Sequence, residues 1–240
     1  MEKNLLIIPA LNEEKSIEQV IVELKKFNYP IDILLVSDGS TDRTVKKAKE
    51  AGLEVIALPY NLGYGAALQT GFKYACARGY ERVIQFDADG QHDPSDISQL
   101  LDIMDGENVD IVVGSRFLGK GDFRTGFMKR TAIILFRWII FMATKVRITD
   151  PSSGLQGLRR EVFKYYAMMG NFPYDYPDAD ILIGMILRGF KVKEFPANIR
   201  VRSQGVSMHS GLRPAYYIFK MLISILVIII RSKSTMEAKQ

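Results

Sequence analysis

Five short apolar runs, separated by stretches with helical spacing, constrain the fold of the first half of the chain more than any other feature. The runs are residues 4–8, 32–37, 54–58, 82–86 and 110–113. Because strands that alternate with helices build parallel sheets covered on both faces, this rhythm predicts an α/β fold with a mostly parallel sheet. Within it, we expect Pro9 to end the first strand and Asn12 to cap the first helix.

Carboxylates follow three of these runs: Glu13, Asp38, and Asp87 with Asp89. In an open α/β sheet, ligands bind at the carboxyl ends of the strands, so we expect these side chains at one site. Alternation along an extended chain would point Asp87 and Asp89 to the same side. Close carboxylates without a His or Cys cluster favour Mg²⁺ or Mn²⁺ over zinc. The alternative is a solvated acidic turn that leads into a helix capped by Asp93.

Gly63 and Gly65 follow the third run and raise the question of a dinucleotide site. The dinucleotide fingerprint requires Gly or Ala three residues after the second glycine, where this chain has Leu68, and it follows the first strand rather than the third. The pattern therefore argues against an NAD site. The acidic loops suit a different ligand, because carboxylates accept hydrogen bonds from nucleobase N–H groups and ribose hydroxyls and bind a diphosphate-held metal.

Four motifs, in this order, carry a resemblance to a known family. They are PALNEE at 9–14, SDGSTD at 37–42, NLGYG at 61–65 and DADGQH at 87–92. Together they resemble the family 2 glycosyltransferases of GT-A fold and, within that family, the dolichyl- or polyprenyl-phosphate sugar transferases. The resemblance implies a Rossmann-like, mixed but mostly parallel sheet flanked by helices, with amphipathic helices at a membrane interface.

The resemblance also implies roles for the residues of these motifs. The nucleotide is expected to contact Pro9, Leu11, Glu13, Asp38, Gly65 and Asp87. The metal, Mg²⁺ or Mn²⁺, is expected on Asp87, Asp89 and Gln91. Such an ion would neutralise the charge that develops on a leaving diphosphate, so activity should depend on it.

The second half opens with a strongly apolar helix. Every residue from 132 to 143 is apolar except Arg137, and Trp138 follows it. Lys129, Arg130, Arg137 and Lys145 recur at intervals of seven or eight residues, which predicts one basic stripe. A core helix has little use for such a stripe, so we predict an interfacial helix, about 127–145, on an anionic membrane surface. A buried core helix is the alternative.

Three later segments point to the acceptor side. Residues 149–160 are predicted to form a turn into a helix, and they match the Asp-Pro-x-Ser-Gly segment of the polyprenyl-phosphate branch. Residues 200–208 resemble that branch's Arg-x-x-Gly-x-Ser-Lys loop, with Met208 in place of the lysine. Short strands are expected at 191–195 and 198–201. The acceptor phosphate is expected on Arg116, Arg130, Arg202, Ser207, Asp150 and Ser153, and the catalytic residues are expected to be Asp89, Arg202, Asp178 and Asp180.

The end of the chain predicts a helix outside the catalytic domain. Residues 215–230 carry Lys220 as their only charge and fall short of the roughly 20 apolar residues that span a bilayer. We expect a glycosyltransferase domain at 1–211, and at 212–240 an apolar helix and basic tail. This helix would associate with a membrane or join copies into a homo-oligomer.

Charge and cysteine content narrow the partners and the compartment. The net charge is +5, and the basic residues concentrate after Arg116. They lie on apolar helices rather than among aromatic residues of an exposed sheet, so no nucleic-acid partner is expected. Cys76 is the single cysteine, which excludes an intrachain disulfide and fits a reducing compartment. We expect a peripheral or monotopic protein at the cytoplasmic face of a membrane.

The expected activity is the inverting, metal-dependent transfer of a hexosyl or N-acetylhexosaminyl group from a UDP-sugar to a polyprenyl phosphate, for cell-envelope glycans or glycoconjugates. Transfer to a sugar hydroxyl is the first alternative. It would require a base, for which Asp178, Asp180 and Asp150 are the candidates, whereas a phosphate acceptor is already ionised. The second alternative is a non-catalytic nucleotide-binding protein or a structural subunit of a membrane complex, which Met208 alone supports.

Overall fold

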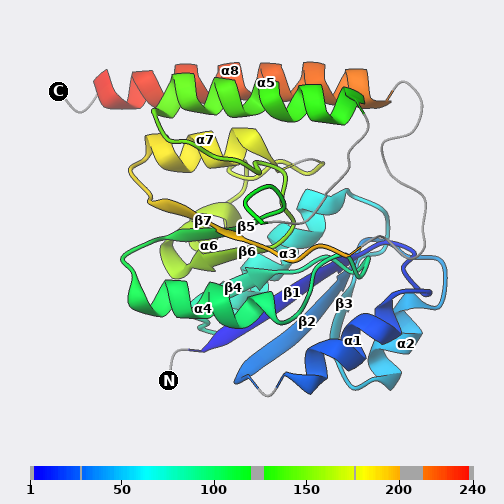
Figure 1. Cartoon of the computed structure of the whole chain (residues 1–240). Coiled ribbons are helices and arrows are strands. Elements are labelled where there is room, and N and C mark those ends of the chain that lie inside the picture. Colours follow the sequence, from blue (N-terminus) through cyan, green and yellow to red (C-terminus); the bar gives the residue numbers. More distant parts are fainter. Residues whose placement is uncertain (1–2, 28, 120–126, 176, 201–212, 238–240) are drawn as a thin grey trace.

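A seven-stranded sheet forms the centre of the structure, a computed structural model that describes residues 3–27, 29–119, 127–175, 177–200 and 213–237 (Figure 1). The strands are β1 (Asn4–Ala10), β2 (Ile31–Ser37), β3 (Glu54–Ala57), β4 (Arg82–Gln85), β5 (Ile111–Ser115), β6 (Gln156–Arg159) and β7 (Val192–Pro196). The helices are α1 (Ile17–Lys26), α2 (Thr44–Glu50), α3 (Tyr64–Ala77), α4 (Asp96–Gly106), α5 (Phe127–Thr144), α6 (Arg160–Ala167), α7 (Ala179–Leu187) and α8 (Arg213–Glu237).

The order of the strands is β3-β2-β1-β4-β6-β5-β7. All neighbouring pairs are parallel except those of β6, which runs antiparallel to β4 and to β5. The predicted mixed, mostly parallel sheet is therefore confirmed. Because β1, β2 and β4 are parallel, their carboxyl ends meet at one edge of the sheet, where ligands bind in folds of this kind.

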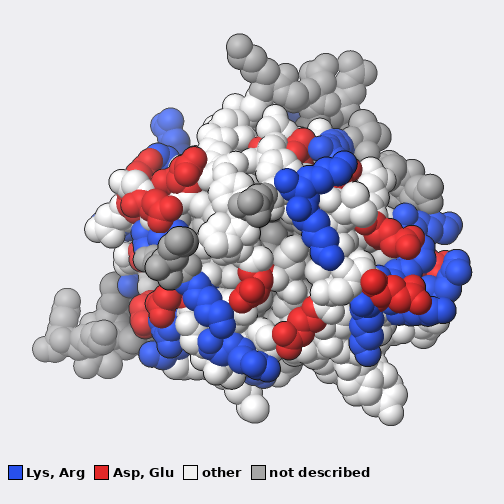
Figure 2. All heavy atoms as spheres, turned by 90° about the horizontal axis from the view of Figure 1, so that it is seen from below, with Lys and Arg blue, Asp and Glu red and all other residues white. Residues whose placement is uncertain are grey.

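Helices cover both faces of the sheet, as predicted. The core cluster on one face contains side chains of α1, α2 and α4, and the cluster on the other contains side chains of α3, α5, α6, α7 and α8. On this second side, α5 and α8 lie next to each other above α7 and form an outer layer (Figure 1). The opposite side of the molecule carries Lys and Arg side chains interspersed with Asp and Glu (Figure 2).

The start of the chain differs from the prediction in two places. Strand β1 does not end at Pro9 but continues to Ala10. The β1–β4 ladder ends at Ile7, so the missing N–H of Pro9 faces no partner strand and the proline is tolerated. Asn12 does not cap the first helix. It has φ +55°, and its Oδ1 accepts the N–H of Thr41 at 2.9 Å, while α1 begins at Ile17.

The helix start predicted after the acidic turn was also wrong in its position. Asp93 does not cap α4, which begins at Asp96. Asp93 Oδ1 instead accepts the N–H of Ser95 at 2.9 Å in the turn before the helix.

Strand β6 is the element that sequence reasoning missed. Residues 149–160 do not lead directly from a turn into a helix, because Gln156–Arg159 first forms a strand between β4 and β5. Close packing favours a small residue there: a Cβ on Gly157 would lie within 2.7 Å of Met104 Sδ. The strand expected at 198–201 is reduced, as far as Arg200, to an isolated bridge between Ile199 and His92.

The predicted basic stripe on α5 was wrong. The helix ends at Thr144, and Lys145 lies beyond it with φ +62°. Arg137 turns toward the body of the protein, where its Nε donates to the Thr149 carbonyl at 2.6 Å and its guanidinium lies 4.6 Å from the Phe117 ring centre. None of the helices in the described ranges combines the length and the apolar content needed to cross a bilayer.

Candidate active site

Asp87 follows β4 and is held from two sides. The Tyr64 hydroxyl, from the first residue of α3, donates to Asp87 Oδ1 at 2.9 Å, and His92 Nε2 lies 3.6 Å from Oδ2. Burial by itself would raise the pKa of Asp87, but His92, the Tyr64 hydroxyl and the charge of Arg116 hold that pKa below its ordinary value. The carboxylate is therefore ionised at neutral pH.

Gly154 provides the room that Asp87 occupies. A Cβ on Gly154 would lie within 2.8 Å of all three heavy atoms of the Asp87 carboxyl group. The backbone before Gly154 is fixed, because Ser153 Oγ donates to the Gly114 carbonyl at 2.5 Å. Any larger residue at position 154 would thus displace the carboxylate rather than the loop.

Asp89 lies in a tight turn, so the alternation expected of an extended chain does not apply to it. The turn places Gly90 at φ +73°, and Asp89 Oδ1 accepts the N–H of Gln91 at 3.0 Å. The charges of Asp87 and Asp89 nevertheless both influence the Tyr64 hydroxyl. The pKa of the Tyr64 hydroxyl is raised well above its ordinary value by burial first and then by nearby charges, those of Asp87 and Asp89 included.

The chemistry of these donors fits a hard divalent cation. Asp87, Asp89 and Gln91 offer carboxylate and amide oxygens, which Mg²⁺ and Mn²⁺ prefer. Among the described residues, no three His, Cys, Asp or Glu side chains are grouped closely enough to hold an ion by themselves. Two carboxylates and an amide leave coordination positions open, and oxygens of a diphosphate would complete such a shell.

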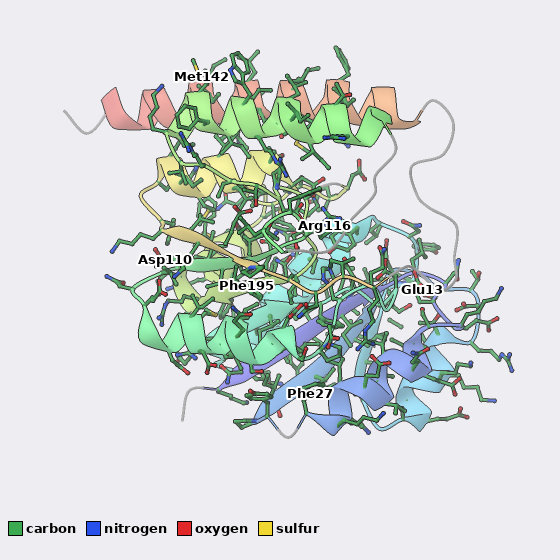
Figure 3. The ribbon with its side chains drawn as sticks, in the orientation of Figure 1. Glu13, Phe27, Asp110, Arg116, Met142 and Phe195 are labelled. Atoms are coloured by element: carbon green, nitrogen blue, oxygen red, sulfur yellow. The ribbon has the colours of Figure 1, made fainter. Side chains whose placement is uncertain are left out.

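Asp38, after β2, is buried and shapes the turn that begins α3. Its Oδ1 accepts the N–H of Leu62 at 2.7 Å and its Oδ2 the N–H of Gly63 at 2.9 Å. Glu13 lies at the edge of the sheet where β1 ends (Figure 3), and its Oε2 accepts the Ser16 hydroxyl at 2.7 Å. Both carboxylates thus lie at the carboxyl edge of the sheet, as expected, and both accept hydrogen bonds from other groups of the protein.

The other residues expected to contact a nucleotide are less polar. Pro9 is buried in β1, and Leu11 is half-buried just after it. Gly65 is buried in the first turn of α3, where a Cβ would collide with the carbonyl of Pro173. The close approach of residues 173–174 therefore requires this glycine.

Arg116, directly after β5 (Figure 3), makes a bidentate contact with Asp150. Its Nε and Nη2 donate to the two carboxylate oxygens at 2.6 Å each, and Nη2 also donates to the Ser152 carbonyl at 3.0 Å. Burial would lower the pKa of Arg116, but the contact with Asp150 raises it, so the guanidinium stays charged. Glu194 fixes the loop by accepting the N–H groups of Thr149 and Asp150 at 2.7 Å each.

This pairing changes the expectation for Asp150. Its side chain is 0% exposed and both of its oxygens are bound to Arg116. It therefore supports the arginine, and its burial argues against a direct contact with an acceptor and against a role as base.

The two carboxylates at the start of α7 serve different purposes. Asp180 is 2% exposed, and its Oδ2 accepts the Ser224 hydroxyl of α8 at 2.5 Å. Burial raises the pKa of Asp180. Asp178 lies near the site instead: its charge adds to burial and Asp87 in raising the pKa of Tyr64, and to Asp150 and Asp87 in raising the pKa of Arg116. The structure thus groups Asp178, not Asp180, with Asp87 and Arg116.

The remaining predicted acceptor residues are scattered or not described. Arg130 is exposed on α5, and Ser153 is buried with its hydroxyl on a backbone carbonyl. Arg202 and Ser207 lie outside the described residues, as does Met208.

Sequence reasoning missed four residues of this site. Tyr64 and His92 stand inside two of the four motifs, so their positions were the available signal. Gly154 lies in the segment matched to the acceptor side. Glu194 gave no signal, because it acts on backbone N–H groups 44 and 45 residues earlier in the chain.

Comparison with known proteins identifies the family. A family model described as "Glycosyl transferase family 2" matches residues 5–166. The chain is 31% identical over 231 residues to a polyprenol monophosphomannose synthase of Mycolicibacterium smegmatis, covering 91% of this chain and 85% of that protein. It is 35% identical over 177 residues to a UDP-N-acetylglucosamine–dolichyl-phosphate N-acetylglucosaminyltransferase of Methanococcus voltae, covering 66% of this chain and 70% of that protein.

The fold has counterparts among solved structures. One is glucosyl-3-phosphoglycerate synthase from Mycobacterium tuberculosis, solved with Mn²⁺ and uridine-diphosphate-glucose. The TM-score is 0.69 at 21% identity, over 95% of this chain and 79% of that one. At this identity the likeness concerns the fold, which is of the GT-A type. With the family model matching residues 5–166, the chain belongs to glycosyl transferase family 2.

Proposed function

We propose that the protein transfers a sugar from a nucleotide sugar, a UDP-sugar, to a polyprenyl phosphate at a membrane surface, with inversion at the anomeric carbon. The observation that carries this proposal is the Asp87 carboxylate at the carboxyl edge of the sheet, held by the Tyr64 hydroxyl and His92, with the charge of Arg116 nearby. Relatives named for polyprenol and dolichyl phosphate support the acceptor class.

On the donor side, the acidic residues would bind a diphosphate through a divalent cation. Asp87, Asp89 and Gln91 would hold Mg²⁺ or Mn²⁺, which would stabilise the negative charge on the departing nucleoside diphosphate. Tyr64 and His92 keep the Asp87 carboxylate in one orientation. Glu13 and Asp38, at the ends of β1 and β2, would face the nucleoside.

On the acceptor side, the charge of Arg116 would attract the phosphate. An acceptor oxygen would attack the anomeric carbon from the side opposite the diphosphate, forming one C–O bond while the bond to the diphosphate breaks. A phosphate is ionised near neutral pH, so no residue has to remove a proton. Arg130 and Arg202 are the further basic residues proposed for this contact.

Transfer to a sugar hydroxyl is the second candidate function, and one observation supports it. Asp178 acts electrostatically on both Tyr64 and Arg116, so a carboxylate is available on the site side. A hydroxyl acceptor would require such a base.

The outer layer of α5 and α8 supports a location on a membrane. Large apolar side chains on it are exposed: Ile134 55%, Trp138 60%, Met142 51%, Phe219 63%, Leu226 58% and Ile230 56%. Figure 3 shows Met142 pointing away from the body of the protein. An exposed apolar surface of two neighbouring helices marks an interaction site, and a lipid acceptor makes the membrane its natural partner. We place the protein at the cytoplasmic face, as a peripheral or monotopic enzyme.

The experiment is a donor and acceptor screen with the purified protein. UDP- and GDP-sugars are each combined with a short polyprenyl phosphate or the matching polyprenol, in Mn²⁺, Mg²⁺ or EDTA, and the released nucleoside diphosphate is measured. The proposal expects UDP release with the phosphate only and none in EDTA. Asp89→Asn should lower the rate by at least about 10²-fold, as expected for losing a group that stabilises developing charge.

Asp102→Asn is the matched control, since Asp102 is exposed on α4. Release of UDP with polyprenol but not with the phosphate would refute the phosphate acceptor. Turnover that persists in EDTA would refute the role of the metal.

A further inference from the structure

Two polar side chains interrupt the apolar sequence of α8. From residue 218 to residue 230 only Lys220 and Ser224 are polar, and because they stand four positions apart they share one side of the helix. Lys220 Nζ donates to the Asp175 carboxylate, and Ser224 Oγ donates to Asp180 at 2.5 Å. Asp175 lies in the segment that leads into α7, and Asp180 lies in the first turn of α7. Helix α8 is therefore attached once to that segment and once to the start of α7.

The same segment rests on the turn that begins α3. The Tyr174 carbonyl accepts the N–H of Ala66 at 3.1 Å. A Cβ on Gly63 would collide with that carbonyl, and a Cβ on Gly65 would collide with the carbonyl of Pro173. Contacts this close leave little freedom for the turn to move without residues 173–174.

The turn at 61–65 also positions Asp87. Asp38 binds the N–H groups of Leu62 and Gly63, and Tyr64 donates its hydroxyl to Asp87 at 2.9 Å. The contacts thus run without a break from α8, through the segment before α7 and the turn at 61–65, to a carboxylate of the proposed metal site.

We propose that Lys220 is a positioning residue for the donor site: through Asp175 it holds residues 173–174 against the turn at 61–65, and so aligns Asp87. This inference rests on the proposed function. The side chains of Lys220 and Asp175 are 43% and 47% exposed, so the ion pair by itself adds little to the free energy of unfolding. Its effect is expected in ligand affinity, because it restrains the segment that the turn packs against.

The test measures the affinity of UDP in the presence of Mn²⁺, by calorimetry, for the full chain and its variants. Lys220→Met should weaken UDP binding by about 5-fold, a common size for coupling between two parts of a protein, with the melting temperature of the free protein nearly unchanged. Lys220→Arg keeps the charge and should restore the affinity. Asp175→Asn should reproduce the loss, and adding it to Lys220→Met should produce no further loss.

Lys73→Met is the matched control, because Lys73 is exposed on α3 and the substitution is the same. Failure of the unaltered protein to bind UDP with Mn²⁺ would refute the proposed function itself. Normal UDP affinity in Lys220→Met, or equal losses in Lys220→Met and Lys73→Met, would refute the positioning role and leave the proposed function standing. A fall in melting temperature without a change in affinity would assign the ion pair to stability alone.

Discussion

Replacing Gly154 by alanine tests the proposed site through a single methyl group. An ordinary contact distance for a Cβ is 3.4 Å or more, whereas the new Cβ would meet even the farthest atom of the Asp87 carboxyl group at 2.8 Å. That atom must retreat by 3.4 − 2.8 = 0.6 Å and the nearer ones by more, so the carboxylate moves by about 1 Å. A misplacement of about 1 Å in a catalytic arrangement costs on the order of 10²-fold in rate, or about 2.7 kcal/mol.

The assay compares kcat/KM for sugar transfer and the affinity for Mn²⁺ in Gly154→Ala and in the unaltered protein. Both values should fall, because Asp87 is a proposed ligand of the ion. Gly106→Ala is the matched control: Gly106 has no atom near its missing Cβ and no left-handed backbone, and it ends α4. If Gly154→Ala kept normal turnover and normal Mn²⁺ affinity, Asp87 could not be the group that the site depends on.

Three further outcomes follow from the burial and charge of particular side chains. Asp150→Asn leaves the Arg116 guanidinium without its carboxylate in a buried place and should lower the free energy of unfolding by about 3 kcal/mol in urea, whereas Glu81→Gln, which breaks an exposed pair, should cost less than about 1 kcal/mol. Burial raises the pKa of Asp180 above 3.8, so the folded protein binds this proton more tightly than the unfolded chain. The contribution of Asp180 to stability should therefore fall as the pH rises from 3.8 through the raised pKa, and melting temperatures measured across pH should gain most from Asp180→Asn at the higher pH values. The fluorescence of Trp138, which is 60% exposed, should shift to the blue with anionic vesicles; a stable dimer whose fluorescence ignores vesicles would instead assign the apolar layer to a second copy of the chain.

The fold of the first half was predictable because its signals are local. Each apolar run indicates a strand and each amphipathic stretch indicates a helix. Their alternation then predicts the parallel sheet. Strand β6 could not be recognised in this way. Its sequence, Gln156-Gly157-Leu158-Arg159, has no apolar run, and it is a strand because β4 and β5 offer it hydrogen bonds from both sides.

In the candidate site too, the residues with a local sequence signal were predicted, and the contacts between distant residues were not. The motifs located Asp87, Asp89 and Gln91 because each stands directly after a strand or in the turn that follows it. The partner of Arg116 is 34 residues away, so the sequence showed a free cation where the fold has a buried pair. Likewise, the spacing of Arg137 and Lys145 assumed a helix that in fact ends at Thr144.

The position of β6 has a consequence for synthesis of the chain on the ribosome. Strand β4 has β1 on one side and β6 on the other. Its second edge therefore stays unpaired until β6 has been made, about 70 residues later, which takes roughly 4–15 s at about 5–20 residues per second. An unpaired strand edge is a template for joining other chains, so the nascent first half is open to aggregation during this interval. A fragment that stops before β6 would keep that edge permanently, and it should need a chaperone to stay in solution.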